Sequence, residues 1–79
     1  MMVRPEDIQN WIAEGLPGCE VQVVGDGHHF EAVVVSDDFD GKPLVARHRM
    51  VYATLGDNMK EAVHALSIKA VTPQEQTGN

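Results

Sequence analysis

The amino-acid sequence predicts a small α+β domain whose helices and strands follow the order αββααβ. In some segments of this 79-residue chain, apolar residues recur every three or four positions, which is typical of helices. In other segments, apolar and polar residues alternate, which is typical of strands. Helical segments separate the second predicted strand from the third, so these two are expected to pair in parallel. The prediction is therefore a three-stranded mixed sheet with its helices packed on one face.

The first helix is expected to begin at residues 4–7, where a proline and two acids suit the first helical turn. Ile8, Trp11 and Ile12 form one apolar stripe on it, and the glycines and proline between Gly15 and Gly18 end it.

Two strands should follow, from Cys19 to Val24 and from His29 to Ser36, because both stretches are rich in β-branched residues. The glycines and aspartate of residues 25–27 suit a tight turn, so the pair is predicted to form a β-hairpin. Cys19 is in phase with the inward valines of its strand and is interpreted as a small buried apolar residue. A redox role for Cys19 is not supported, because the sequence has no second cysteine to form a CxxC motif with it.

The second half of the chain begins with a polar connection anchored by Phe39. A helix is expected from Pro43 to Gly56, with a buried stripe comprising Leu44, His48, Val51 and Leu55. A short second helix, capped by Asp57 or Asn58, should run through Val63.

The third strand is predicted around Leu66, Ile68 and Ala70, where apolar and polar residues alternate. Residues 72–75 then have the form of a capping box and are expected to start a final helical turn. The single domain spans residues 1–79, with an ordered core of about residues 4–75 and a frayed tail at 76–79.

Composition excludes several classes of function. A formal net charge of −6 disfavours non-specific nucleic-acid binding. No signal peptide or membrane-spanning run is found, so a cytoplasmic protein is expected. Nucleophile elbow, phosphate loop and HExxH patterns are also missing, so the sequence does not predict an enzyme.

Two histidines give the clearest indication of a site. His29 opens the second strand and His64 stands immediately before the third. Parallel neighbours begin at the same edge of a sheet, roughly 5 Å apart, so both imidazoles can approach one metal ion or one partner surface. The alternatives are that His29 is only a hairpin residue and that His64 caps the preceding helix. His48 is interpreted as a packed residue at the edge of the core.

The second half of the chain also contains a basic and an acidic cluster. Arg47 and Arg49 are expected to point away from the apolar stripe and, with Lys42, form the only local basic cluster. This cluster is either a solvated helix face or a contact for a glutathione carboxylate, an acidic partner or a phosphate. Three aspartates between residues 37 and 40 lack the spacing of a calcium loop and are interpreted as a solvated loop.

Four segments together resemble the BolA family: residues 25–30 (GDGHHF), 39–44 (FDGKPL), 47–52 (RHRMVY) and 63–67 (VHALS). The resemblance implies a class II KH-like fold and a non-enzymatic partner of a monothiol glutaredoxin, active in iron–sulfur cluster trafficking or iron homeostasis. It implies a shared [2Fe–2S] cluster ligated by the glutaredoxin cysteine, a glutathione thiolate and His64, with His29 as a second candidate. Alone, the chain is expected to be a monomer or weak homodimer without a cluster.

Two departures from the resemblance are informative. BolA-like chains often place a tryptophan after the Thr-Pro segment, where this chain has Gln76, so the last helix is expected to be short or absent. The turn at residues 56–59 lacks the second glycine of a KH RNA-binding loop, which disfavours RNA binding. The alternative function is a DNA-binding transcriptional regulator using Arg47 and Arg49; a catalytic thiol protein using Cys19 has the weakest support.

Overall fold

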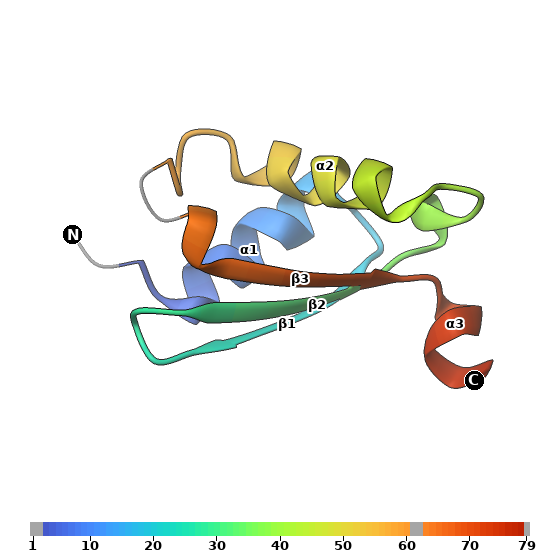
Figure 1. Ribbon diagram of the computed structural model, residues 1–79, viewed down its shortest axis with the longest axis horizontal. Coiled ribbons are helices and arrows are strands. Elements are labelled where there is room, and N and C mark those ends of the chain that lie inside the picture. Colours follow the sequence, from blue (N-terminus) through green and yellow to red (C-terminus); the bar gives the residue numbers. More distant parts are fainter. Residues whose placement is uncertain (1–2, 61–62, 79) are drawn as a thin grey trace.

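A computed structural model of the protein describes residues 3–60 and 63–78 (Figure 1). The elements in chain order are α1 (Pro5–Gly15), β1 (Glu20–Gly25), β2 (Phe30–Val35), a 3-10 turn (Asp37–Phe39), α2 (Leu44–Leu55), a second 3-10 turn (Val63–Ala65), β3 (Leu66–Val71) and α3 (Pro73–Gly78). The predicted α+β class is confirmed.

The three strands form one sheet in the order β1-β2-β3. β1 pairs with β2 antiparallel, and β2 pairs with β3 in parallel, with Phe30 opposite Leu66. Both pairings agree with the sequence prediction. Helices α1 and α2 lie on the same side of this sheet (Figure 1), so each strand turns alternate side chains toward them.

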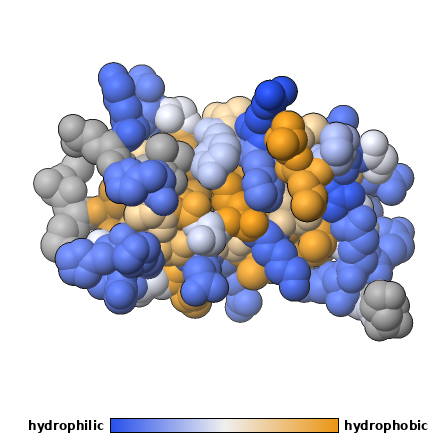
Figure 2. Space-filling model, viewed as in Figure 1, coloured by the Kyte–Doolittle hydropathy of each residue, from blue (hydrophilic) through white to orange (hydrophobic). Residues whose placement is uncertain are grey.

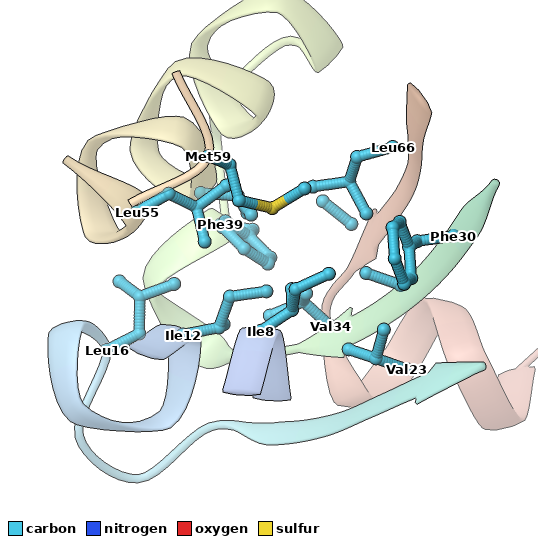
Figure 3. Close-up of a cluster of buried hydrophobic side chains, with 13 residues drawn as sticks. Ile8, Ile12, Leu16, Val23, Phe30, Val34, Phe39, Leu55, Met59 and Leu66 are labelled. Carbon is cyan, nitrogen blue, oxygen red and sulfur yellow. The ribbon is translucent and has the colours of Figure 1, made fainter. Parts of the chain in front are cut away.

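The hydrophobic core fills the space between the sheet and these two helices. Phe39 is fully buried there, as its predicted anchoring role requires. Figure 3 shows Met59, from the turn after α2, reaching across this core toward Leu66. Cys19 is half-buried and packs against the edge of the core. Burial raises the pKa of its thiol, so the thiolate needed for redox chemistry is disfavoured.

The buried stripe of α2 differs from the predicted one. Its buried residues are Arg47, Val51 and Leu55, whereas Leu44 is 64% exposed and His48 is half-buried. A charged residue is rarely expected inside, because its burial requires specific hydrogen-bond partners that a sequence pattern does not display.

The predicted helix between Asp57 and Val63 is also corrected. Residues 56–60 form turns, in which the Asn58 and Lys60 amides donate to the carbonyls of Leu55 and Asp57. Residues 61–62 lie outside the described part of the chain, and Val63–Ala65 is a single 3-10 turn. Gly56, at a positive φ of 53°, ends α2 as predicted.

Arg47 joins three elements at the far end of the sheet from the histidines. Its guanidinium donates to the Lys42 carbonyl (2.8 Å), the Ala70 carbonyl (3.1 Å) and both carboxylate oxygens of Glu75 (2.6 and 3.0 Å). It also lies 6.0 Å from the centroid of the Phe39 ring. The expectation that Arg47 points away from the core into solvent is therefore wrong, because its side chain satisfies polar groups at the end of β3.

The last helix is short but present. The Thr72 amide donates to Glu75 Oε1 (3.0 Å) and the Glu75 amide to Thr72 Oγ1 (3.2 Å), which is the predicted capping box. The Gln76 amide and the Thr77 hydroxyl also donate to carbonyls one turn earlier. α3 therefore runs to Gly78, within the stretch 76–79 for which a frayed tail was predicted, and residue 79 lies outside the described part of the chain.

Acidification is expected to weaken this end of the molecule. Hydrogen bonds from Arg47 and then from the Thr72 amide lower the pKa of Glu75 from 4.5 to about 2. The carboxylate contribution to stability is therefore complete above pH 4.5 and is lost as the pH falls toward about 2. Urea unfolding of the native protein should show this loss, and Glu75→Gln should lack it. If the free energies of unfolding of the native protein and of Glu75→Gln changed with pH in the same way, Glu75 would not be the group responsible for the loss.

Gly15 marks a close approach of α1 to α2. A Cβ atom at this position would lie 2.5 Å from both Cβ and Cγ2 of Thr54. Gly15→Ala should therefore lower the free energy of unfolding by about 1–3 kcal/mol through overpacking, as measured by urea denaturation. The exposed neighbour Glu14 provides a matched control, since Glu14→Ala should change stability by less than about 0.5 kcal/mol. Equal changes in the free energy of unfolding for Gly15→Ala and Glu14→Ala would contradict the close packing of Gly15 against Thr54.

Candidate functional site

The candidate site is the end of the sheet where β2 and β3 begin, and we call it the histidine rim. It comprises His28 and His29 in the β1–β2 turn and His64 in the 3-10 turn before β3. Figure 1 shows that the hairpin turn and the start of β3 lie at the same end of the sheet. All three histidines are exposed.

Asp26 fixes the main chain of the hairpin turn. Its Oδ1 accepts hydrogen bonds from the amides of His28 (2.8 Å) and His29 (2.9 Å), and its own amide donates to the His29 carbonyl (3.2 Å). These bonds lower the pKa of the Asp26 carboxyl, which keeps it ionised. Sequence analysis placed Asp26 in a tight turn, which is confirmed, but did not predict its hydrogen bonds to the two histidine amides.

Gly25 allows the chain to approach itself closely beside His29. A Cβ atom at Gly25 would lie 2.5 Å from the His29 carbonyl oxygen and 2.6 Å from Cδ1 of Phe30. Together with Asp26, this contact defines the path of the backbone into β2. The imidazole of His29 therefore projects from a backbone with a fixed conformation.

The strand register brings His64 to the same edge. Phe30 and Leu66 are partners in the parallel ladder, so His29 precedes its partner position by one residue and His64 precedes its own by two. Neighbouring strands lie about 4.8 Å apart. The predicted meeting of these two chain segments is confirmed, while the ligand role of either side chain stays a prediction.

The rim offers donors suited to part of an iron–sulfur coordination sphere. Imidazole nitrogen replaces thiolate on one iron of Rieske-type clusters, and both His29 and His64 are accessible to solvent. A [2Fe–2S] cluster takes four ligands, so two histidines fit it only with thiolates from elsewhere. Among residues 3–60 and 63–78, no three His, Cys, Asp or Glu side chains are grouped to hold a metal ion.

Other predicted site residues lie apart from the rim. Lys42 and Arg49 are exposed, but Arg47 is occupied by its internal partners, so the three do not form one surface cluster. Asp37, Asp38 and Asp40 are exposed, and the Asp38 amide donates to Ser36 Oγ (3.0 Å). Cys19 precedes β1, whose first residue pairs with the last of β2, so the thiol lies at the opposite end of the sheet from His29.

Comparison with known proteins agrees with this arrangement. A family model described as "BolA-like protein" matches residues 17–75. Protein BOLA2 of Arabidopsis thaliana is 46% identical over 79 residues, covering 94% of this chain and 84% of the relative. The structure of a BolA protein homologue from Coxiella burnetii superimposes with a TM-score of 0.84 at 49% identity, covering 95% and 97% of the two chains.

Two further similarities bear on function. The solution structure of yeast Fra2 matches with a TM-score of 0.72 and 31% identity, covering 99% of this chain and 88% of Fra2. The DNA-binding transcriptional regulator BolA of Escherichia coli is 43% identical over 54 residues, which are 68% of this chain and 51% of the regulator. Within the described residues, no helix has the length and apolar character needed to cross a membrane.

Proposed function

The chain belongs to the BolA-like protein family, and from this premise we propose that it is a non-enzymatic partner of a monothiol glutaredoxin. In this proposal the two proteins share a [2Fe–2S] cluster, to which this chain contributes His64. The complex serves iron–sulfur cluster trafficking or iron homeostasis. The observation that supports the proposal most is the exposed histidine pair of the rim, placed at one sheet edge by the β2–β3 register.

The chemistry of the rim suits this role. A neutral imidazole that replaces a thiolate removes one negative charge from the cluster and raises its reduction potential. It can also be protonated, which makes cluster release sensitive to pH. When bound, the cluster supplies the redox and transfer chemistry. His64 supplies a nitrogen donor, and His29, held by the Asp26 turn, supplies a second donor or a contact beside it.

Cluster loading of the complex provides the first test. Adding the native protein to a cluster-loaded monothiol glutaredoxin with glutathione should change visible absorption and circular dichroism, since imidazole alters the charge-transfer bands of the iron it ligates. The change should saturate at equimolar protein. A spectrum identical to that of the glutaredoxin alone would contradict the proposed function.

A DNA-binding role is the second candidate, and the similarity to the DNA-binding transcriptional regulator of Escherichia coli favours it. The internal position of Arg47 and the net charge of −6 oppose it, because phosphate contacts require accessible cations. Binding to duplex DNA at about 150 mM salt that weakens with Arg49→Ala would support this role. No binding under those conditions would reject it.

A further inference from the structure

The outer strands β1 and β3 each present backbone groups that the sheet itself does not use. The Ser36 amide donates to the Val71 carbonyl (3.0 Å), which sets the phase of the parallel ladder. In such a ladder alternate residues bond to the neighbouring strand, so Ser67, Lys69 and Val71 bond to β2. The amides and carbonyls of Leu66, Ile68 and Ala70 therefore face outward.

Side chains from the helices occupy part of both outer edges. On β1, the Val23 amide donates to Oε1 of Gln9 in α1 (3.2 Å). On β3, the Ala70 carbonyl accepts from Arg47 of α2 (3.1 Å). Among the hydrogen bonds of the described residues, none reaches the outward groups of Ile68. The open position of β3, Ile68, therefore lies four residues after His64.

An exposed flank of α2 runs along the same edge of the sheet as β3 (Figure 1). Thr54 packs against Gly15 of α1, and Val51 and Leu55 point into the core. Residues four apart share a helix flank, so Leu44, His48 and Tyr52 lie on the flank directed away from α1. The first turn of α2 lies at the end of β3, where Arg47 reaches the Ala70 carbonyl, and the helix runs back from there toward the start of the strand (Figure 1). Tyr52 therefore lies nearer to Ile68 than Leu44 does. Leu44 is 64% and Tyr52 is 39% exposed. Figure 2 shows apolar side chains across the middle of the face formed by α2 and β3.

We propose that an extended segment of the partner adds to the outer edge of β3 at Leu66–Ile68 as a fourth strand. Its backbone pairs with the outward groups of Ile68, and its apolar side chains pack against Tyr52. This inference rests on the proposed function, because a strand added about 4.8 Å from β3 runs beside His64. It thereby positions the partner's thiolate for the shared cluster. Unpaired strand edges bind extended chains in this way.

Amide hydrogen exchange measured by NMR tests the pairing residue by residue. In the free protein, the Ile68 amide should exchange rapidly, while those of Ser67 and Lys69 exchange slowly because they bond to β2. Excess apo monothiol glutaredoxin should slow the Ile68 amide by about tenfold or more, the protection of a new backbone bond worth about 1.4 kcal/mol. No slowing at Ile68, or slowing by a single-stranded oligonucleotide but not by the glutaredoxin, overturns the inference.

Variants provide a second measurement. Ile68→Pro removes an outward donor at an edge position, where proline is tolerated, and should abolish binding while circular dichroism confirms the fold. Should that variant not fold, Tyr52→Ala replaces it and should weaken binding by about fivefold or more. Val24→Ala is the matched control because Val24 is an exposed apolar residue (63%) on the far strand β1. Equal affinities of Tyr52→Ala and Val24→Ala overturn the inference.

These outcomes separate the docking mode from the proposed function. A changed cluster spectrum with an unprotected Ile68 amide rejects strand addition and leaves the shared cluster intact. An unchanged cluster spectrum with a protected Ile68 amide supports strand addition and rejects the shared cluster. If neither the cluster spectrum nor the exchange rate of the Ile68 amide changes, both strand addition and the shared cluster are rejected.

Discussion

His64→Ala is expected to abolish the change that the native protein produces in the visible circular dichroism of a cluster-loaded monothiol glutaredoxin. His64 is exposed at the start of β3, and alanine cannot donate to iron, so the cluster should keep the spectrum of the glutaredoxin alone. Because the side chain is exposed, the substitution should alter the free energy of unfolding by less than about 0.5 kcal/mol. Loss of the circular dichroism change can then be assigned to loss of the imidazole ligand and not to unfolding.

His28→Ala is the matched control, since His28 is an exposed histidine in the same rim without a predicted ligand role. It should leave the native spectral change in place. His29→Ala distinguishes a second ligand, which would produce a different spectrum, from a neighbouring contact, which would produce only weaker binding. A native spectral change in His64→Ala would show that this imidazole does not ligate the cluster.

Arg47→Ala is expected to cause the largest loss of stability among single substitutions outside the apolar core. Removing the guanidinium leaves the carbonyls of Lys42 and Ala70 without their donor and separates Glu75 from its partner. Buried polar groups without partners are costly, and the packing against Phe39 is lost as well. The melting temperature should fall by roughly 10 °C or more, as measured by calorimetry.

Arg49→Ala provides the control for charge and helix propensity. Arg49 lies two residues further along α2 and is exposed, so the variant should melt within roughly 3 °C of the native protein. If both variants melted at the same temperature, Arg47 would not hold α2, β3 and α3 together. A stable Arg47→Ala that loses glutaredoxin binding would instead support the original surface role of this arginine.

The elements that could be predicted from sequence are those whose signals are local. β-Branched residues identified β1 and β2, and alternating apolar residues identified β3. The proline and acids at residues 4–7 marked the start of α1, and the Thr72–Glu75 capping box located α3. The parallel pairing of β2 and β3 followed from chain connectivity, and with it the meeting of His29 and His64 at one edge.

The features that sequence analysis missed depend on tertiary contacts. Arg47 was expected outside because it flanks His48 and was not counted in the predicted apolar stripe, yet the end of β3 and Glu75 offer it partners from distant positions. The predicted buried stripe began at Leu44, but the first turn of α2 leaves that side chain in solvent. The open edge of β3 was likewise not predictable, because it depends on which outward groups the helix side chains happen to reach.

The measurement closest to the central claim is pulsed electron paramagnetic resonance of the reduced shared cluster. The chain, labelled with ¹⁵N-histidine, would be mixed with unlabelled cluster-loaded glutaredoxin and glutathione. We expect a strongly coupled ¹⁵N signal from an imidazole bound directly to iron, present in the native protein and in His28→Ala and lost in His64→Ala. A reduced cluster with no ¹⁵N coupling in the native complex, or with an undiminished coupling in His64→Ala, would contradict ligation by His64.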